Sequence, residues 1–75
     1  MKARIRNTIR DLRAEVGMTQ QHLADSIGLT RQTVIAIEGD KYSPSLDTAF
    51  RIALVFGVPL EQVFQYEVQG KKRQA

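Results

Sequence analysis

The sequence predicts a mainly α-helical domain of five short helices, with a small two-stranded antiparallel β-ribbon formed by the two ends of the chain. Three observations lead to this prediction. In five segments, apolar residues recur at the three-to-four-residue spacing of an amphipathic helix. Glycine or proline stands at most boundaries of these segments, where a helix has to end or begin. The two ends instead alternate apolar and polar residues, which is typical of a strand with one buried face.

The first three predicted helices are separated by glycine turns. Residues 8–16 carry Ile9, Leu12 and Val16 at helical spacing, with Asn7 as the N-cap. The second helix runs over residues 19–26 and the third from residue 30 to about residue 38, each with a threonine as its cap. Gly28 lies between them because only a residue that tolerates positive φ permits so short a turn. The inward positions of these two helices are Leu23, Ala24, Ile27, Val34 and Ile37.

The fourth helix is predicted between its cap Ser45 and its terminating Gly57, and a short fifth helix from Pro59 through Phe64. Proline suits the first position of a helix, where its missing N–H has no intrahelical partner. One core stripe along the fourth helix is expected from Leu46, Ala49, Ile52, Ala53 and Phe56.

The ribbon is predicted from alternation at the two ends. The apolar members are Ala3, Ile5, Phe64, Tyr66 and Val68. Placing Arg4 or Arg6 opposite Glu67 favours antiparallel pairing. Because a two-stranded ribbon is barely stable alone, we expect it to pack against the helices. The alternative is two frayed termini.

Length and composition restrict the class of protein. The 75 residues suffice for one domain, which we assign to residues 1–70, followed by a basic tail over residues 71–75. The net charge is +3, with basic residues gathered at both ends, where they attract polyanions or merely aid solubility. The absence of cysteine excludes disulfides and thiolate zinc sites. No apolar run approaches the roughly 20 residues of a membrane span, and no signal peptide is evident, so we expect a cytoplasmic location.

The central stretch, residues 19–34, reads as a helix, a tight glycine turn and a second helix. Such a unit can present its second helix to the major groove of DNA. A step of 100° per residue divides that helix into two arcs. The inward arc holds Thr30, Val34, Ile37 and Glu38, and the outward arc holds Gln32, Ile35, Ala36 and Gly39, with Arg31 and Thr33 at the borders. The outward arc lacks acidic residues, whereas a merely solvated face more often mixes both signs.

Over residues 7–64 the chain resembles the lambdoid-repressor or XRE-type helix-turn-helix family. The matching residues are Ile9-Arg10-Asp11-Leu12-Arg13, Gly17-Met18-Thr19-Gln20, Leu23-Ala24, Gly28, Arg31-Gln32-Thr33-Val34 and Ile37-Glu38. Residues 41–46 and 59–64 resemble a subgroup of short repressors that includes the enterococcal cytolysin repressor. The resemblance implies a five-helix repressor-type helix-turn-helix bundle, a homodimer, and sequence-specific binding to a palindromic operator in double-stranded DNA.

The resemblance also assigns residues to the contacts with DNA. Arg31 and Gln32 match base-reading positions, where Arg pairs with guanine and Gln with adenine. Arg31 holding a phosphate instead is the alternative. The predicted base contacts are Arg31, Gln32, Thr33, Ile35 and Ala36, the two apolar ones against thymine methyl groups. The predicted backbone contacts are Gln20, Thr30, Lys41, Tyr42 and Ser43.

Arg13 and Glu38 both fall on inward arcs, where a charge needs a partner. The resemblance implies that they form a buried, structural bridge between the first and third helices. It also places the homodimer interface at the fifth helix, through Leu60, Val63 and Phe64.

Two alternatives share this fold. One is a DNA-binding antitoxin, and the other is a protein-interaction module that does not read DNA. Both predict a functional surface away from the third helix, for which Phe50, Leu54, Val55, Leu60 and Val63 are the candidates. An enzyme is not predicted, because the chain has a single histidine, no nucleophile–base arrangement and no phosphate-binding glycine loop. We predict no cofactor, metal or small-molecule ligand.

Overall fold

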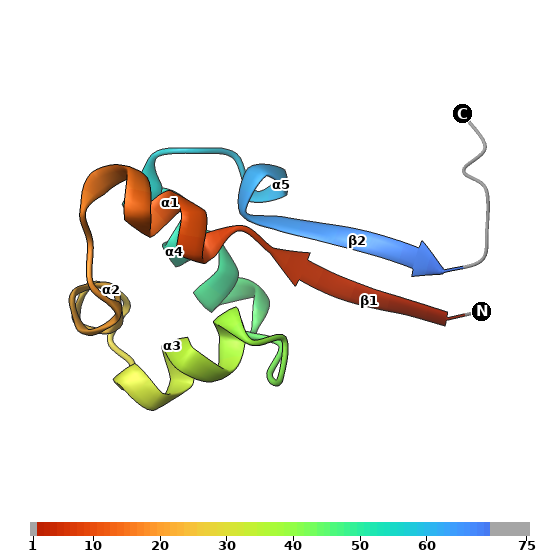
Figure 1. Ribbon diagram of the computed structural model, residues 1–75, viewed down its shortest axis with the longest axis horizontal. Helices are drawn as coiled ribbons and strands as arrows, with labels where there is room; N and C mark the ends of the chain where they lie inside the picture. Colours follow the sequence, from red (N-terminus) through yellow and green to blue (C-terminus); the bar gives the residue numbers. More distant parts are fainter. Residues whose placement is uncertain (1, 70–75) are drawn as a thin grey trace.

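The computed structural model describes residues 2–69, in which five helices lie between two strands (Figure 1). In chain order the elements are β1 (Lys2–Asn7), α1 (Ile9–Val16), α2 (Gln20–Ile27), α3 (Arg31–Glu38), α4 (Leu46–Phe56), α5 (Leu60–Val63) and β2 (Phe64–Gln69). The predicted fold class is confirmed. The predicted basic tail, with Lys71, Lys72 and Arg73, lies outside the described residues. Within residues 2–69, no helix has both the length and the apolar character needed to cross a membrane.

The ribbon pairs as predicted. β1 and β2 are antiparallel, with Arg4 opposite Glu67 and Ile5 opposite Tyr66. Arg4 Nε lies 3.3 Å from Glu67 Oε1, and Arg6 Nη1 lies 3.7 Å from Glu67 Oε2. The base of the ribbon joins the helices, whereas its far end extends away from them (Figure 1). The expected packing against the helices therefore holds only at the base, and Tyr66 remains 67% exposed.

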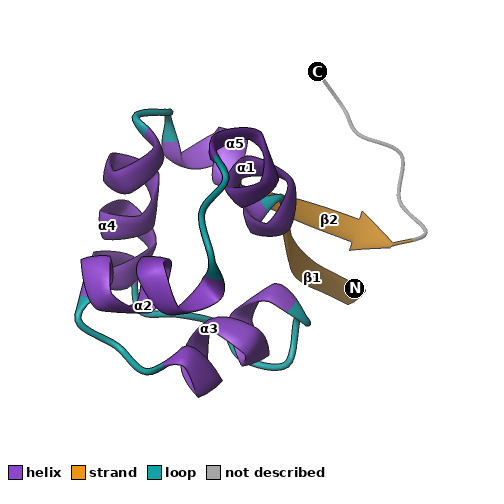
Figure 2. Ribbon diagram, turned by 60° about the vertical axis from the view of Figure 1, so that its left-hand side comes forward, coloured by secondary structure: helices purple, strands orange, loops and turns teal. Residues whose placement is uncertain are grey.

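The core lies between the helices, which surround it (Figure 2). Leu23 and Ala24 of α2, Ile52 of α4 and Val63 of α5 have no exposed surface. Burying each of the larger aliphatic side chains contributes about 1.5–3 kcal/mol relative to leaving it exposed. The core consists of Ile9, Leu12, Leu23, Ala24, Ile27, Val34, Ile37, Ile52, Ala53 and Val63.

Side-chain caps set the starts of three helices. Thr19, Thr30 and Ser45 each accept a hydrogen bond from the backbone N–H three residues later. Pro59 stands at the N-cap of α5 rather than inside it, and Phe64 already belongs to β2. Asn7 ends β1, and the N-cap of α1 is Thr8.

Two predicted core residues are exposed. Val16 is 62% exposed and Leu46 is 68% exposed, although both fit the helical spacing of the core stripes. Val16 is the last residue of α1 and Leu46 is the first of α4. At these helix ends the apolar stripe extends beyond the neighbouring elements, so no side chain covers it.

Truncating Ile9 should destabilise the protein much more than truncating Val16 in the same helix. Ile9 is 1% exposed, so Ile9→Ala removes buried methyl groups and leaves a cavity, at a cost of about 2–5 kcal/mol. Val16→Ala, the matched control, should change the free energy of unfolding by less than about 0.5 kcal/mol. Urea denaturation followed by circular dichroism measures both, and equal losses would contradict the assignment of Val16 to the surface.

Candidate nucleic-acid interface

The turn between α2 and α3 fixes their relative orientation. Gly28 ends α2 with φ of 73°, and the N–H of Leu29 donates to the carbonyl of Ala24 at 2.9 Å. Leu23 and Ala24 are fully buried, and Val34 and Ile37 of α3 are 1–2% exposed in the same core. The outward face of α3 is therefore held by packing on its inward face.

That outward face carries the predicted base-reading residues. Arg31, Gln32 and Ile35 are exposed, whereas Thr33 and Ala36 are half-buried. Thr30 is exposed, but its hydroxyl accepts the N–H of Thr33 at 3.2 Å and lies 3.1 Å from Thr33 Oγ1. α3 contains one acidic residue, Glu38, and its side chain is 1% exposed. The exposed face of α3 thus combines one cation, an amide and apolar groups without a negative charge.

The carboxylate of Glu38 binds Arg13 inside the molecule. Arg13 Nε donates to Glu38 Oε2 at 2.6 Å, and Arg13 Nη2 donates to Glu38 Oε1 at 3.1 Å. Arg13 Nη1 donates to the carbonyl of Met18 at 2.9 Å. The side chain of Arg13 is 14% exposed. This bidentate pair joins α1 to α3 and also holds the turn that leads into α2.

Gln20, predicted to contact a phosphate, takes part in the same network. Its Nε2 donates to Glu38 Oε1 at 3.2 Å, so one amide hydrogen is used inside the protein and the other remains available. The guanidinium of Arg10 lies near the same oxygen, with Nε 3.9 Å away, and its side chain is 76% exposed. No sequence pattern indicated the contact between Gln20 and Glu38, because their separation along the chain follows no local period.

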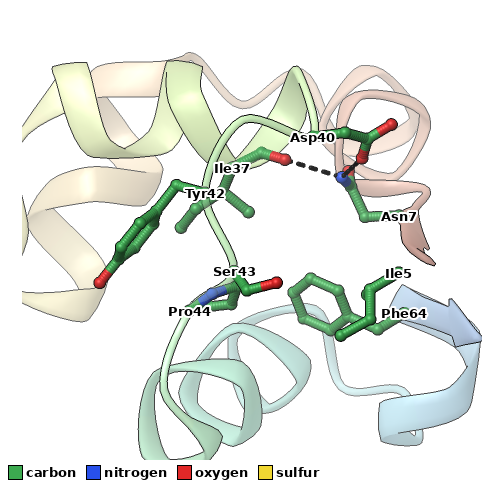
Figure 3. A pocket seen from close by; sticks show the side chains of 8 residues that line it. All are labelled: Ile5, Asn7, Ile37, Asp40, Tyr42, Ser43, Pro44 and Phe64. Atoms are coloured by element: carbon green, nitrogen blue, oxygen red, sulfur yellow. Dashed lines mark hydrogen bonds between the residues drawn. The ribbon is translucent and has the colours of Figure 1, made fainter. Parts of the chain in front are cut away.

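The loop after α3 carries Lys41, Tyr42 and Ser43, all of them exposed. Figure 3 shows Tyr42 and Ser43 in the same region as Asn7, Asp40 and Phe64, so the loop lies at the base of the ribbon. These residues, with Ile5, Ile37 and Pro44, line a cavity of about 20 Å³, roughly enough for one water molecule.

Two polar residues at this junction were not predicted to act near the interface. Asn7 Nδ2 donates to the carbonyl of Ile37 at 2.9 Å and to Asp40 Oδ1 at 3.1 Å. Asp40 has φ of 60°, the only positive value among non-glycine residues of the described chain. The place of Asp40 directly after Gly39 was a weak sign in the sequence that it lies in a turn. Nothing in the sequence pattern indicated its hydrogen bond with Asn7.

The predicted dimer residues occupy different environments. Leu60 and Phe64 are half-buried, but Val63 is fully buried within its own chain. Val63 is a core residue of its own chain, because α5 is a single turn whose inward position it occupies. Leu60 instead borders an open apolar groove of about 340 Å³ between α4 and α5, lined by Phe50, Ala53, Leu54, Gly57, Val58, Pro59 and Leu60.

Comparisons with known proteins agree with this geometry. The family model described as helix-turn-helix matches residues 9–63. An uncharacterized HTH-type transcriptional regulator of Methanocaldococcus jannaschii is 49% identical over 63 residues, which cover 84% of this chain and 96% of the relative. The cryptic phage CTXphi transcriptional repressor RstR of Vibrio cholerae is 38% identical over 55 residues, covering 73% of this chain and 50% of the repressor.

A solved structure shares the fold. The crystal structure of a candidate DNA-binding protein from Bacteroides fragilis superposes with a TM-score of 0.74 at 28% identity, covering 81% of this chain and 98% of that chain. The names of the sequence relatives describe regulators of transcription, which bears out the prediction that the chain is not an enzyme.

Removing one partner of the Arg13–Glu38 pair should cost far more than replacing both. Glu38→Ala leaves the guanidinium of Arg13 buried without a carboxylate, at a cost of about 3–5 kcal/mol in the free energy of unfolding. The double variant Arg13→Met/Glu38→Leu buries no charge and should recover most of that loss. As a control, Asp47→Ala breaks the exposed pair with Arg51 and should cost less than about 1 kcal/mol. Chemical denaturation distinguishes these outcomes, and additive losses in the double variant would contradict the buried-pair account.

Proposed function

The chain belongs to the helix-turn-helix family of transcriptional regulators, and we propose that it is a repressor that binds a palindromic operator as a homodimer. The observation that carries the proposal is the exposed face of α3, where Arg31 and Gln32 lie and to which the single acidic residue of the helix, the buried Glu38, adds no charge. The proposal places the protein in the cytoplasm, where it reaches chromosomal DNA.

Arg31 and Gln32 are the proposed readers of base identity. They occupy the first two positions of α3, next to its cap, where side chains of a recognition helix reach base edges. A guanidinium pairs bidentately with guanine and an amide with adenine, each contributing about 1–3 kcal/mol of discrimination. Ile35, which is 40% exposed, lies one helical turn further and suits a thymine methyl group, with Ala36 and Thr33 at the edge of the contact.

The proposed backbone contacts lie at both ends of the motif. The free amide hydrogen of Gln20 lies at the N-terminal end of α2, where backbone N–H groups also favour an anion. Lys41, Tyr42 and Ser43 follow the C-terminal end of α3 and supply one cation and two hydroxyl groups. The hydroxyl of Thr30 is engaged in the cap, so its proposed contact with a phosphate is supported only by its exposure.

The homodimer proposal rests on the groove between α4 and α5. The groove is lined by apolar residues, among them Leu60 and Leu54, and Leu54 is 77% exposed. A second copy related by a two-fold axis presents the same surface to it, which is how isologous dimers form. Such a dimer sets two recognition helices about 34 Å apart, in successive major grooves of one face of the duplex.

Repression by occlusion is the simplest mechanism for this arrangement. A dimer across two successive major grooves covers DNA that RNA polymerase needs at a promoter. One sequence relative, RstR, is named as a transcriptional repressor, which supports this direction of regulation.

Binding selection from random duplex DNA should return a palindromic sequence whose preference depends on Arg31 and Gln32. Arg31→Ala and Gln32→Ala should each relax preference at one base pair per half-site, and each should weaken binding by about 1–3 kcal/mol for every base pair that is no longer read. The matched controls are Arg51→Ala on α4 and Gln62→Ala on α5, which should leave the selected sequence unchanged. Unaltered preference in both α3 variants would refute their assignment as base readers.

Leu60→Glu should convert the dimer to a monomer, because it places a carboxylate in the apolar groove. Sedimentation equilibrium measures the change in mass, and half-length operators measure whether the monomer still binds. Leu46→Glu is the matched control, since Leu46 is exposed on α4 but lies outside the groove. A monomeric wild-type protein at high concentration, or a dimer that survives Leu60→Glu, counts against this interface.

A further inference from the structure

The side chain of Asn7 connects the start of α1 to the end of α3 and to the loop after α3, which lie 30 or more residues further along the chain. Its Oδ1 accepts the N–H of Ile9 at 3.1 Å, at the start of α1. Its Nδ2 donates to the carbonyl of Ile37 at 2.9 Å, near the end of α3, and to Asp40 Oδ1 at 3.1 Å, in the loop that follows (Figure 3). Asn7 itself ends β1, where it pairs with Phe64 of β2.

This set of partners requires an asparagine. A side-chain amide offers two hydrogens on nitrogen and an accepting oxygen, and here both ends are used. The orientation of the amide follows from the partners, because nitrogen faces two oxygens and oxygen faces an N–H. Aspartate keeps the acceptor and loses both donors, and glutamine is one carbon too long to keep all three hydrogen bonds.

The bonds of Asn7 meet the chain where α3 turns into the loop. Asp40 adopts the left-handed conformation, with φ of 60°, immediately before Lys41. The N–H of Asp40 donates to the carbonyl of Ile37 at 3.1 Å, and the N–H of Lys41 donates to the carbonyl of Ala36 at 2.9 Å. Asn7 therefore binds both the last turn of α3 and Asp40, the residue at which the chain turns from the helix into the loop.

We propose that Asn7 is a positioning residue for DNA binding, which holds the end of the recognition helix and the Lys41–Ser43 loop against the base of the ribbon. The inference rests on the proposed function, since the loop is useful in this position only if it contacts the DNA backbone. Asn7 lies outside residues 9–63, the part of the chain that the family model matches. The base of the ribbon thereby supports α3 and the Lys41–Ser43 loop, although the far end of the ribbon extends away from the helices.

Asn7→Asp separates this role from helix capping. The variant retains an oxygen for the N–H of Ile9, so α1 keeps its start. It loses both donors and brings a carboxylate toward Asp40 Oδ1 and the carbonyl of Ile37, which repels the loop. Asn7→Asp/Asp40→Asn restores the net charge and lets an amide at position 40 donate to the new carboxylate, while the bond to Ile37 remains broken.

Two measurements test the proposal. In the free protein, amide hydrogen exchange at Asp40 and Lys41 should be about tenfold faster in Asn7→Asp, with exchange at Leu23 and Ala24 in α2 unchanged. Affinity for the selected duplex should fall by about tenfold, the scale of removing one or two hydrogen bonds, with the order of preferred sequences unchanged. The double variant should recover part of both effects. Gln62→Glu on α5 controls for the added negative charge.

The outcomes are distinguishable. Unchanged amide hydrogen exchange at Asp40 and Lys41 overturns the proposal that Asn7 holds the end of α3 and the loop, whatever the protein binds. Faster exchange with unchanged affinity overturns its role in DNA binding, as does an equal loss of affinity in Gln62→Glu or no recovery in the double variant. A wild-type protein that binds no duplex at all refutes the proposed function instead, and the exchange data then still decide whether Asn7 holds the loop. If Asn7→Asp does not fold, amide exchange is measured in the double variant, which lacks the two facing carboxylates. The double variant still has no hydrogen bond from residue 7 to the carbonyl of Ile37, so exchange at Asp40 and Lys41 should still be faster than in the wild type.

Discussion

The carboxylate of Glu38 imposes the strongest constraint on the arrangement of the helices. Its side chain is 1% exposed, and a buried carboxylate without partners is too costly to persist. Arg13 of α1 and Gln20 of α2 donate to its oxygens, so the charge is satisfied only when three helices meet at one place. Apolar packing tolerates small shifts between helices, whereas three directed hydrogen bonds do not. The same inward turn of Glu38 removes a negative charge from the surface that we propose to face DNA.

The exposed face of α3 is consequently oriented before any DNA is bound. The cap formed by Thr30 holds its first turn, the buried Val34 and Ile37 hold its middle, and Glu38 and Asn7 hold its last turn. Each support uses backbone atoms or the inward arc, which leaves the outward side chains unengaged. Ordering these groups in advance lowers the entropy lost on binding. A recognition helix mounted on loops alone would have to be ordered by the DNA itself.

Local patterns in the sequence predicted most of the fold but few of its long-range polar contacts. The helix starts followed from single cap residues such as Thr19. The charges of the ribbon predicted its antiparallel pairing but left Arg4 or Arg6 opposite Glu67, and the structure has Arg4 there. The exposure of Val16 was not predictable, because periodicity shows which face is apolar and not where the covering neighbour ends. The contact between Asn7 and Asp40 spans 33 residues and follows no period. The positions proposed to read DNA came from family resemblance. The geometry shows only that Arg31, Gln32 and Ile35 are exposed on α3, whereas Thr33 and Ala36 are half-buried.

The small number of base-reading groups is itself an argument for two copies. If Arg31 and Gln32 read bases as proposed, the two side chains of one protomer together discriminate by about 2–6 kcal/mol. Distinguishing an operator from the many nonspecific sites of a genome takes about 4–10 kcal/mol. A single domain therefore reaches at most the lower part of this range, while two copies on one palindrome, at about 4–12 kcal/mol, span it without any further contact. The apolar groove beside Leu60 is the surface that we propose for this association. If the chain reads DNA through α3, the physics of recognition favours the dimer independently of family resemblance.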